Sequence, residues 1–153
     1  MERRKVLFVC IGNSCRSQMA EGFARCHGAD IVEPFSAGLA PAMSIASETR
    51  KVMLEKDVDL GEQFPKDLYL VRPELMDTVI NLSGMILPDG PWKDLRNWPV
   101  PDPIGKPEKF HRQVRDDVEA RVMELLFELR QRGQTGAPEV RPPARVRFGR
   151  TRT

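Results

Sequence analysis

The residues best suited to chemistry are a cysteine and an arginine separated by five residues, Cys10 and Arg16. They bracket a segment between an apolar run and a helix-like run, where several backbone N–H groups can converge on one anion. Gly12 permits backbone angles that a side chain would forbid, and Asn13 tolerates left-handed conformations. Arg16 carries a planar fork that can bind two oxygens of a tetrahedral anion. The spacing therefore predicts an oxyanion-binding loop.

Cys10 is the predicted nucleophile of this loop. A free cysteine titrates near pH ~8.5, and a helix N-terminus, converging N–H groups and Arg16 would all favour its thiolate. Ser17 could donate a hydrogen bond to the sulfur, stabilising the thiolate and easing its departure as a leaving group. Cysteines are also common as inert buried residues, so Cys10 and Arg16 alone indicate little. The residue types gathered at one strand-to-helix junction favour the catalytic interpretation.

The elements that must position this loop alternate between strands and helices. Apolar runs predict strands over residues 5–9, 30–36, 76–82 and 97–100. Helical periodicity predicts a helix beginning at Arg16 or Ser17, a second over 44–56, a short helical region over 67–75 and a long amphipathic helix over 109–132. This alternation is typical of an α/β domain with a parallel sheet, in which ligands bind beyond the carboxyl ends of the strands. Cys10 lies at such an end.

Composition is that of an ordinary globular chain. Of 153 residues, 41% are apolar and 30% charged with nearly balanced signs, which favours one folded domain over a disordered chain. No apolar run approaches the roughly 20 residues of a membrane helix, and the basic N-terminus lacks a signal-peptide cleavage pattern. We therefore expect a cytoplasmic protein without a membrane segment.

The cysteines indicate reduced thiols. Cys10, Cys15 and Cys26 are an odd number within one sixth of the chain, which is a poor disulfide framework. Their spacing, with His27 included, matches no zinc-site pattern. We expect no metal and no organic cofactor.

The composition changes after the long helix. Residues 133–153 are rich in Gly, Pro, Thr and Arg, with five arginines between Arg141 and Arg152 against the single Glu139. We place the folded domain at residues 1–132 and interpret 133–153 as a disordered basic tail. No aromatic-rich, base-stacking surface accompanies the arginines, so we do not expect a nucleic-acid partner.

The segment from Val9 to Ser17 resembles the signature of the low-molecular-weight protein tyrosine phosphatase superfamily, which also contains thioredoxin-coupled arsenate reductases. The resemblance continues through residues 18–22, 36–38 and 101–103 to the long last helix, and it covers about residues 4–132. It implies a flavodoxin-like, doubly wound parallel sheet of about four strands with helices on both faces.

The resemblance also implies roles for individual residues. Cys10 would be the nucleophile, Arg16 the oxyanion clamp and Asp102 the general acid. The residues that bind the oxyanion or support the loop would be Ile11, Gly12, Asn13, Ser14, Cys15 and Ser17. A carboxyl group in a proline-bounded loop could protonate a departing oxygen and then activate water against a phosphocysteine. Asp-Pro is also ordinary turn chemistry, and without the resemblance the two interpretations of Asp102 stand equal.

Two features separate the branches of the superfamily. The run 13–22 is closer to the arsenate reductase style, and Ile104 takes the place after Asp-Pro where phosphatases usually carry tyrosine. Against this, thioredoxin-coupled reductases use two further cysteines after the third strand, whereas this sequence has Ser83 there and no cysteine after Cys26. Serine cannot form a disulfide.

We therefore rank a phosphomonoester hydrolase first, with a phosphorylated substrate and a phosphocysteine intermediate. The alternative is an arsenate reductase whose Cys10–arsenic adduct is resolved by an external thiol, so that arsenate is the oxyanion and a thiol reductant is the partner. A second alternative is a non-catalytic oxyanion-binding or redox-sensing module in which Cys10 and Cys15 form a reversible disulfide.

Overall fold

The structure is a computed structural model that describes residues 2–135, built around a four-stranded sheet in the order β2-β1-β3-β4. The strands are β1 (Arg4–Cys10), β2 (Val32–Gly38), β3 (Thr78–Asn81) and β4 (Leu95–Asn97), and every pairing is parallel. The helices are α1 (Arg16–Gly28), α2 (Ser47–Leu54) and α3 (Glu108–Thr135), with two short 3-10 helices, η1 (Leu68–Val71) and η2 (Pro73–Leu75). This strand order is the start of the flavodoxin-like order, which confirms the predicted fold class.

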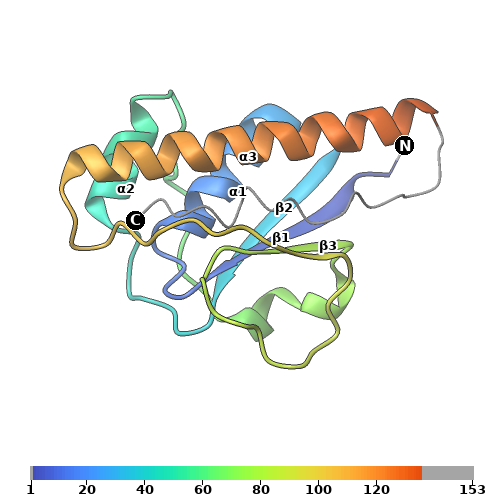
Figure 1. The fold of residues 1–153 in the computed structure, drawn as a ribbon, viewed down its shortest axis with the longest axis horizontal. Coiled ribbons are helices and arrows are strands. Elements are labelled where there is room, and N and C mark those ends of the chain that lie inside the picture. Colours follow the sequence, from blue (N-terminus) through green and yellow to red (C-terminus); the bar gives the residue numbers. More distant parts are fainter. Residues whose placement is uncertain (1, 136–153) are drawn as a thin grey trace.

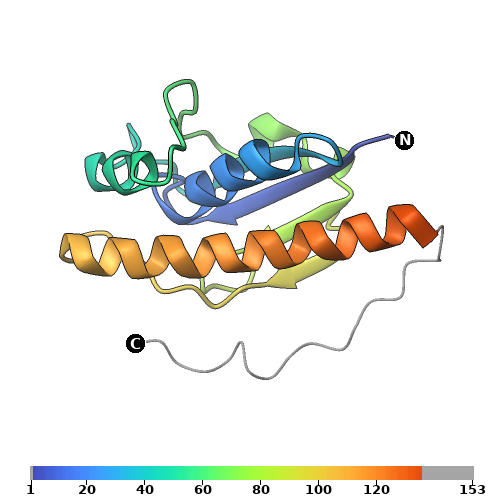
Figure 2. The ribbon, with the colours of Figure 1, turned by 90° about the horizontal axis from the view of Figure 1, so that it is seen from above.

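Helices cover both faces of the sheet because alternate residues of β1 point to opposite sides. Val6 and Phe8 join the larger apolar core beneath the α-helices, while Leu7 and Val9 join a smaller core with η1 and the loop after β3. Figure 1 shows α1, α2 and α3 on one side of the sheet and the short helices on the other. Figure 2 shows α1 and α3 side by side over the same face.

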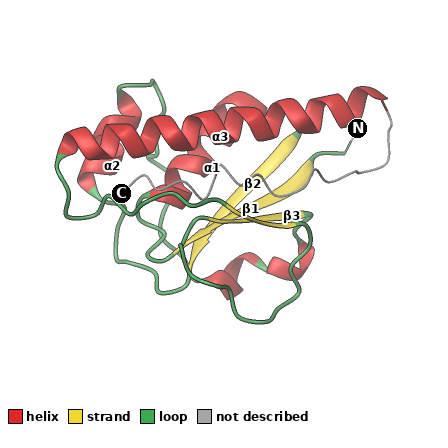
Figure 3. Cartoon of the chain, viewed as in Figure 1, coloured by secondary structure: helices red, strands yellow, loops and turns green. Residues whose placement is uncertain are grey.

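Figure 3 shows how helices, strands and loops alternate along the chain. Most element boundaries differ from the predicted ones by a few residues. The predicted fourth strand at 97–100 was displaced: β4 is Leu95–Asn97, and the buried Trp98 and Val100 follow it in the core without joining the ladder. The second helix begins at Ser47 rather than Ser44, because the chain before it bonds to the loop after β1. The long helix continues through Thr135, and the rest of the predicted tail lies outside the described residues.

The register brings the end of β1 against the end of β2, where Cys10 lies opposite Gly38. A Cβ atom on Gly38 would lie 2.8 Å from the backbone oxygen of Ile11 and 3.0 Å from the backbone nitrogen of Asn13. Only glycine leaves room for the loop to turn so close to β2. Within residues 2–135, no helix is both long and apolar enough to cross a membrane.

Candidate active site

The loop that carries Cys10 joins β1 to α1, and we call residues 10–17 the oxyanion loop. Its carbonyl oxygens are turned toward the chain after β2 and accept hydrogen bonds from N–H groups there. The four acceptors are Cys10, Ile11, Gly12 and Ser14, whose donors are Leu39, Ala40, Ala42 and Ala46 at 2.8–3.1 Å. With the carbonyls held outward, the N–H groups of the loop can converge on an anion at the amino end of α1.

Cys10 is almost fully buried, with 2% of its surface exposed, and its sulfur lies 2.8 Å from the Ser17 hydroxyl. The Asn13 side-chain amide donates to the same hydroxyl at 2.7 Å. Because that amide occupies the acceptor side of the Ser17 oxygen, the hydroxyl hydrogen is available to the sulfur. Ser17 can therefore donate to a Cys10 thiolate, as the sequence suggested.

The Arg16 guanidinium ties the oxyanion loop to the segments that follow β3 and β4. Its Nη1 donates to the carbonyl oxygens of Leu82 at 2.7 Å and Val100 at 3.0 Å, which follow β3 and β4. Its Nη2 lies 3.6 Å from a carboxylate oxygen of Asp102. The guanidinium is thus fixed by backbone acceptors on one edge, while its other edge faces the position of the predicted acid.

Asp102 lies in the segment between β4 and α3, and we call residues 98–107 the acid loop. Its side chain is 48% exposed, whereas that of Arg16 is 4% exposed. The carboxylate accepts a hydrogen bond from the Ile104 N–H at 3.0 Å, which is the turn chemistry expected of Asp-Pro. The structure therefore brings Asp102 to Arg16 and also satisfies the simpler turn interpretation.

The other two cysteines occupy different environments. Cys15 precedes α1, and burial raises the pKa of its thiol to about 12. Cys26 is exposed near the far end of α1, ten residues after Arg16. At about 1.5 Å of rise per residue, this places Cys26 roughly 15 Å along the helix from the oxyanion loop.

The sequence did not indicate that Gln18 and residues 64–66 support the oxyanion loop. The Gln18 side chain, fully buried, donates to the backbone oxygens of Asn13 at 2.9 Å and Phe64 at 3.0 Å. The Lys66 N–H donates to the Asn13 side-chain oxygen at 3.0 Å. The sequence marks Gln18 only as part of the resemblance over residues 18–22, and residues 64–66 carry no signal because their contacts are made by backbone atoms.

Glu21 carries a half-buried carboxylate that lies near the amine of Lys66. Burial raises the pKa of Glu21, which accepts a 2.5 Å hydrogen bond from Ser36, and burial lowers the pKa of the neighbouring Lys66. Opposite charges at Glu21 and Lys66 offset part of each desolvation penalty. In the described residues, no group of three His, Cys, Asp or Glu side chains could hold a metal ion.

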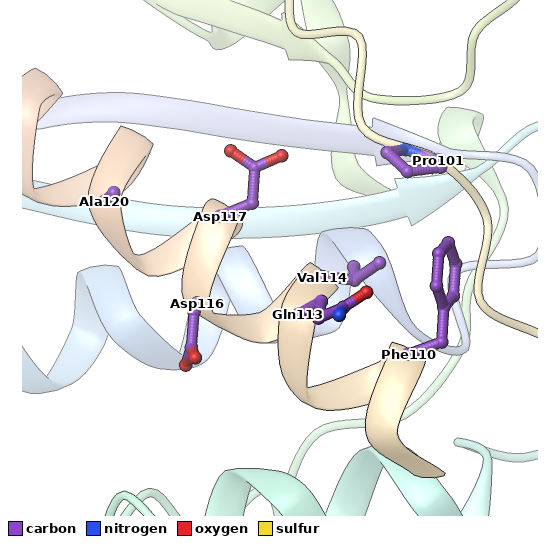
Figure 4. A pocket seen from close by; sticks show the side chains of 7 residues that line it. All are labelled: Pro101, Phe110, Gln113, Val114, Asp116, Asp117 and Ala120. Atoms are coloured by element: carbon purple, nitrogen blue, oxygen red, sulfur yellow. The ribbon is translucent and has the colours of Figure 1, made fainter. Parts of the chain in front are cut away.

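A separate open pocket of about 540 Å³ lies between the acid loop and α3 (Figure 4). It is lined by Pro101, Phe110, Gln113, Val114, Asp116, Asp117 and Ala120. None of these residues belongs to the oxyanion loop. The pocket therefore adjoins the acid loop from outside and does not enclose the predicted nucleophile.

The fold places a loop of the kind that can bind a tetrahedral oxyanion beside a buried cysteine. The family profile described as low molecular weight phosphotyrosine protein phosphatase matches residues 5–89. This chain belongs to that family, and the predicted superfamily is confirmed.

Similar proteins extend the comparison over most of the described chain. A glutaredoxin arsenate reductase of Synechocystis is 33% identical over 130 residues, covering 82% of this chain and 98% of the relative. An arsenate reductase of Bacillus cereus is 33% identical over 128 residues, covering 80% and 94%. A solved arsenate reductase in its phosphate-binding state superposes with a TM-score of 0.78 at 33% identity, over 82% of this chain and 98% of that one.

Proposed function

We propose that this protein is an arsenate reductase in which an external thiol resolves a Cys10–arsenic adduct. The observation that carries the proposal is a complete oxyanion loop in a chain whose similar proteins, at about a third identity, are named arsenate reductases. This reverses the ranking made from the sequence, which put phosphomonoester hydrolysis first. The missing pair of relay cysteines had decided that ranking, yet their absence removes only one way of resolving the adduct.

In the first step, arsenate would occupy the oxyanion loop, held by loop N–H groups and by the free edge of Arg16. The Cys10 thiolate attacks arsenic, forming a sulfur–arsenic bond, and one arsenate oxygen leaves as water after taking up protons. Asp102, 3.6 Å from Arg16, is positioned to supply a proton to that oxygen. Ser17 stabilises the attacking sulfur.

The second step requires a thiol that reaches the Cys10 sulfur. Cys15 is poorly suited because burial raises its pKa to about 12, and the protonated thiol is a weak nucleophile. Cys26 lies at the opposite end of α1, and the sequence holds no further cysteine. The resolving thiol therefore comes from another molecule.

The electrons balance with two external thiols. The first attacks the Cys10 sulfur, so that a mixed disulfide forms and the sulfur–arsenic bond breaks. The electron pair of that bond stays on arsenic, which leaves as arsenite. The second thiol reduces the mixed disulfide and restores Cys10. The name of the Synechocystis relative supports glutaredoxin as the class of resolving protein.

Phosphomonoester hydrolysis is the second candidate. It needs Cys10, Arg16 and Asp102 only, and the family to which the chain belongs is described as a phosphatase family. The exposed carboxylate of Asp102 beside Arg16 suits an acid that protonates a leaving group and then activates water.

A paired assay on fully reduced protein tests these proposals. Arsenite formation is measured with glutaredoxin plus glutathione, with thioredoxin and with mycothiol systems supplied separately, and p-nitrophenyl phosphate hydrolysis is measured in parallel. We expect arsenite with a glutaredoxin or low-molecular-weight thiol system and only trace hydrolysis, both abolished by Cys10→Ser. Hydrolysis without arsenite from any system would replace the first candidate with the second. Phosphate binding with neither activity would support the oxyanion-binding or redox-sensing module.

A further inference from the structure

We propose that Gln18 and Gln63 are positioning residues for Cys10, acting through a chain of hydrogen bonds in which every donor points toward the sulfur. The chain starts at the partly exposed end of α1 and finishes in the oxyanion loop. Its members in order are Arg25, Gln63, Gln18, Asn13, Ser17 and Cys10. The inference rests on Cys10 as the proposed nucleophile, and it does not depend on which oxyanion is the substrate.

The donor direction of the hydrogen bonds from Asn13 to Ser17 and from Ser17 to Cys10 is fixed by their other partners. The Asn13 side-chain oxygen accepts from the Lys66 backbone N–H, which can only donate. The Asn13 side-chain nitrogen must therefore face Ser17, to which it donates at 2.7 Å. Ser17 is left with its hydrogen free for the sulfur of Cys10, 2.8 Å away.

The donor direction of the hydrogen bond from Gln63 to Gln18 is fixed in the same way. The Gln18 side-chain nitrogen faces two backbone oxygens, those of Asn13 and Phe64, which can only accept. Its side-chain oxygen must therefore accept, and it does so from the Gln63 side-chain nitrogen at 2.7 Å. The same Gln63 nitrogen lies 3.1 Å from the Gln18 backbone oxygen.

The outer end is a cation. The Gln63 side-chain oxygen accepts from the Arg25 guanidinium, a group that has donors only. Arg25 is itself held by the backbone oxygen of Asp59 at 2.9 Å. At Asn13 the chain passes from the backbone oxygen, which accepts from Gln18, to the side-chain amide, which donates to Ser17, so the outer bonds act on Cys10 by holding Asn13 in place.

The hydrogen bonds hold Asn13 in an uncommon backbone conformation. Asn13 has φ of 50°, in the left-handed region that asparagine tolerates better than most other non-glycine residues, and it is fully buried. Its backbone oxygen depends on Gln18, its side-chain oxygen on Lys66, and its side-chain nitrogen donates to Ser17. Without the Gln18 amide, the backbone oxygen of the buried Asn13 would lose its donor, and buried polar groups are seldom left unpaired. The loop would then relax away from the geometry in which Ser17 donates to Cys10.

The test compares one substitution at three places. Gln18→Met and Gln63→Met keep the length of the side chain and remove its hydrogen bonds, and Gln113→Met on the exposed face of α3 is the matched control. In each full-length protein, carrying Cys26→Ser, the rate of Cys10 alkylation by iodoacetamide is followed against pH by tandem mass spectrometry. We expect Gln18→Met to raise the pH midpoint of alkylation by about one unit and Gln63→Met by about half a unit. Gln113→Met should leave it unchanged.

A second readout separates positioning from general loosening of the fold. Protection of Cys10 by inorganic phosphate should weaken several-fold in Gln18→Met, with the thermal midpoint still well above the assay temperature. If Gln18→Met does not fold, Gln63→Met decides the question, because it leaves the Gln18 bonds to the oxyanion loop in place. Midpoints for both variants that match Gln113→Met would overturn the proposal. The outcome is independent of whether arsenite or phosphate is released, since no turnover is measured.

Discussion

The two loops that meet at Arg16 differ in how firmly the fold holds them. In the oxyanion loop, Cys10, Asn13 and Ser17 are almost completely buried and bonded to one another or to the chain behind them. In the acid loop, Asp102 is half exposed and Ile104 is 47% exposed. The comparison teaches that the fold holds the predicted nucleophile, Cys10, in place without a substrate, whereas the predicted acid, Asp102, has room to move. Arg16 is the one side chain described above that contacts both loops.

Arg16→Lys should break the connection between the loops and have the largest effect. Lysine keeps the charge but cannot span the carbonyls of Leu82 and Val100 and a substrate oxygen at once. We expect a fall of about a thousandfold in kcat/KM for whichever oxyanion reaction is found. Arg112→Lys, in the exposed ion pairs of α3 with Glu55, is the control. A loss of less than tenfold would contradict the clamp role of Arg16.

Asp102→Asn should disable the acid loop and leave the oxyanion loop intact. Removing a general acid typically costs about a hundredfold or more in turnover. Because Asp102 makes no hydrogen bond to Cys10 or Ser17 among those described, the pH midpoint of Cys10 alkylation should change little. Steady-state rates of the variant measure the loss of turnover, and its profile of Cys10 alkylation against pH measures the midpoint. Full activity in Asp102→Asn would leave the residue with its turn role alone.

A pair of glycine substitutions sharpens the contrast in packing. In Gly38→Ala, the added Cβ would press on backbone atoms of Ile11 and Asn13 that cannot easily move. We expect a loss of about 2 kcal/mol in the free energy of unfolding, together with weakened phosphate binding. In Gly105→Ala, the new Cβ meets open space, and the left-handed φ of 80° alone should cost about 1 kcal/mol with phosphate binding unchanged. Urea unfolding and phosphate protection of Cys10 measure the two effects.

The smallest expected effect concerns Cys15, buried at the base of the oxyanion loop. Its folded-state pKa of about 12 lies above its ordinary value of 9.0 because of burial. The stabilisation from this protonated thiol is complete below pH 9 and is lost as the pH rises toward 12, since only the unfolded chain releases the proton easily. Between about pH 9 and 10, the parent should therefore lose roughly 1 kcal/mol relative to Cys15→Ala. Parallel unfolding curves for the two proteins at both pH values would contradict this.

The sequence alone determined which residues are the candidates for chemistry. Cys10, Arg16 and the residues between them occupy seven consecutive positions, so their meeting at one strand-to-helix turn follows from local pattern. The alternation of apolar runs determined the parallel sheet, and the periodicity of the last helix determined its extent to within three residues. These features are local, and local spacing is what a sequence displays directly.

Tertiary structure alone decided how that chemistry is supported. The bonds from Gln18 to Phe64, from Lys66 to Asn13, and from Arg16 to Leu82 and Val100 join residues 46 to 84 positions apart. Most of these partners are backbone atoms, which every residue type possesses, so no residue type marks them in the sequence. The error in the predicted fourth strand also arises from tertiary structure. Trp98 and Val100 are apolar because they pack in the core, and they lie outside the ladder between β3 and β4. Packing brings such groups together only after the whole sheet and its helices have formed.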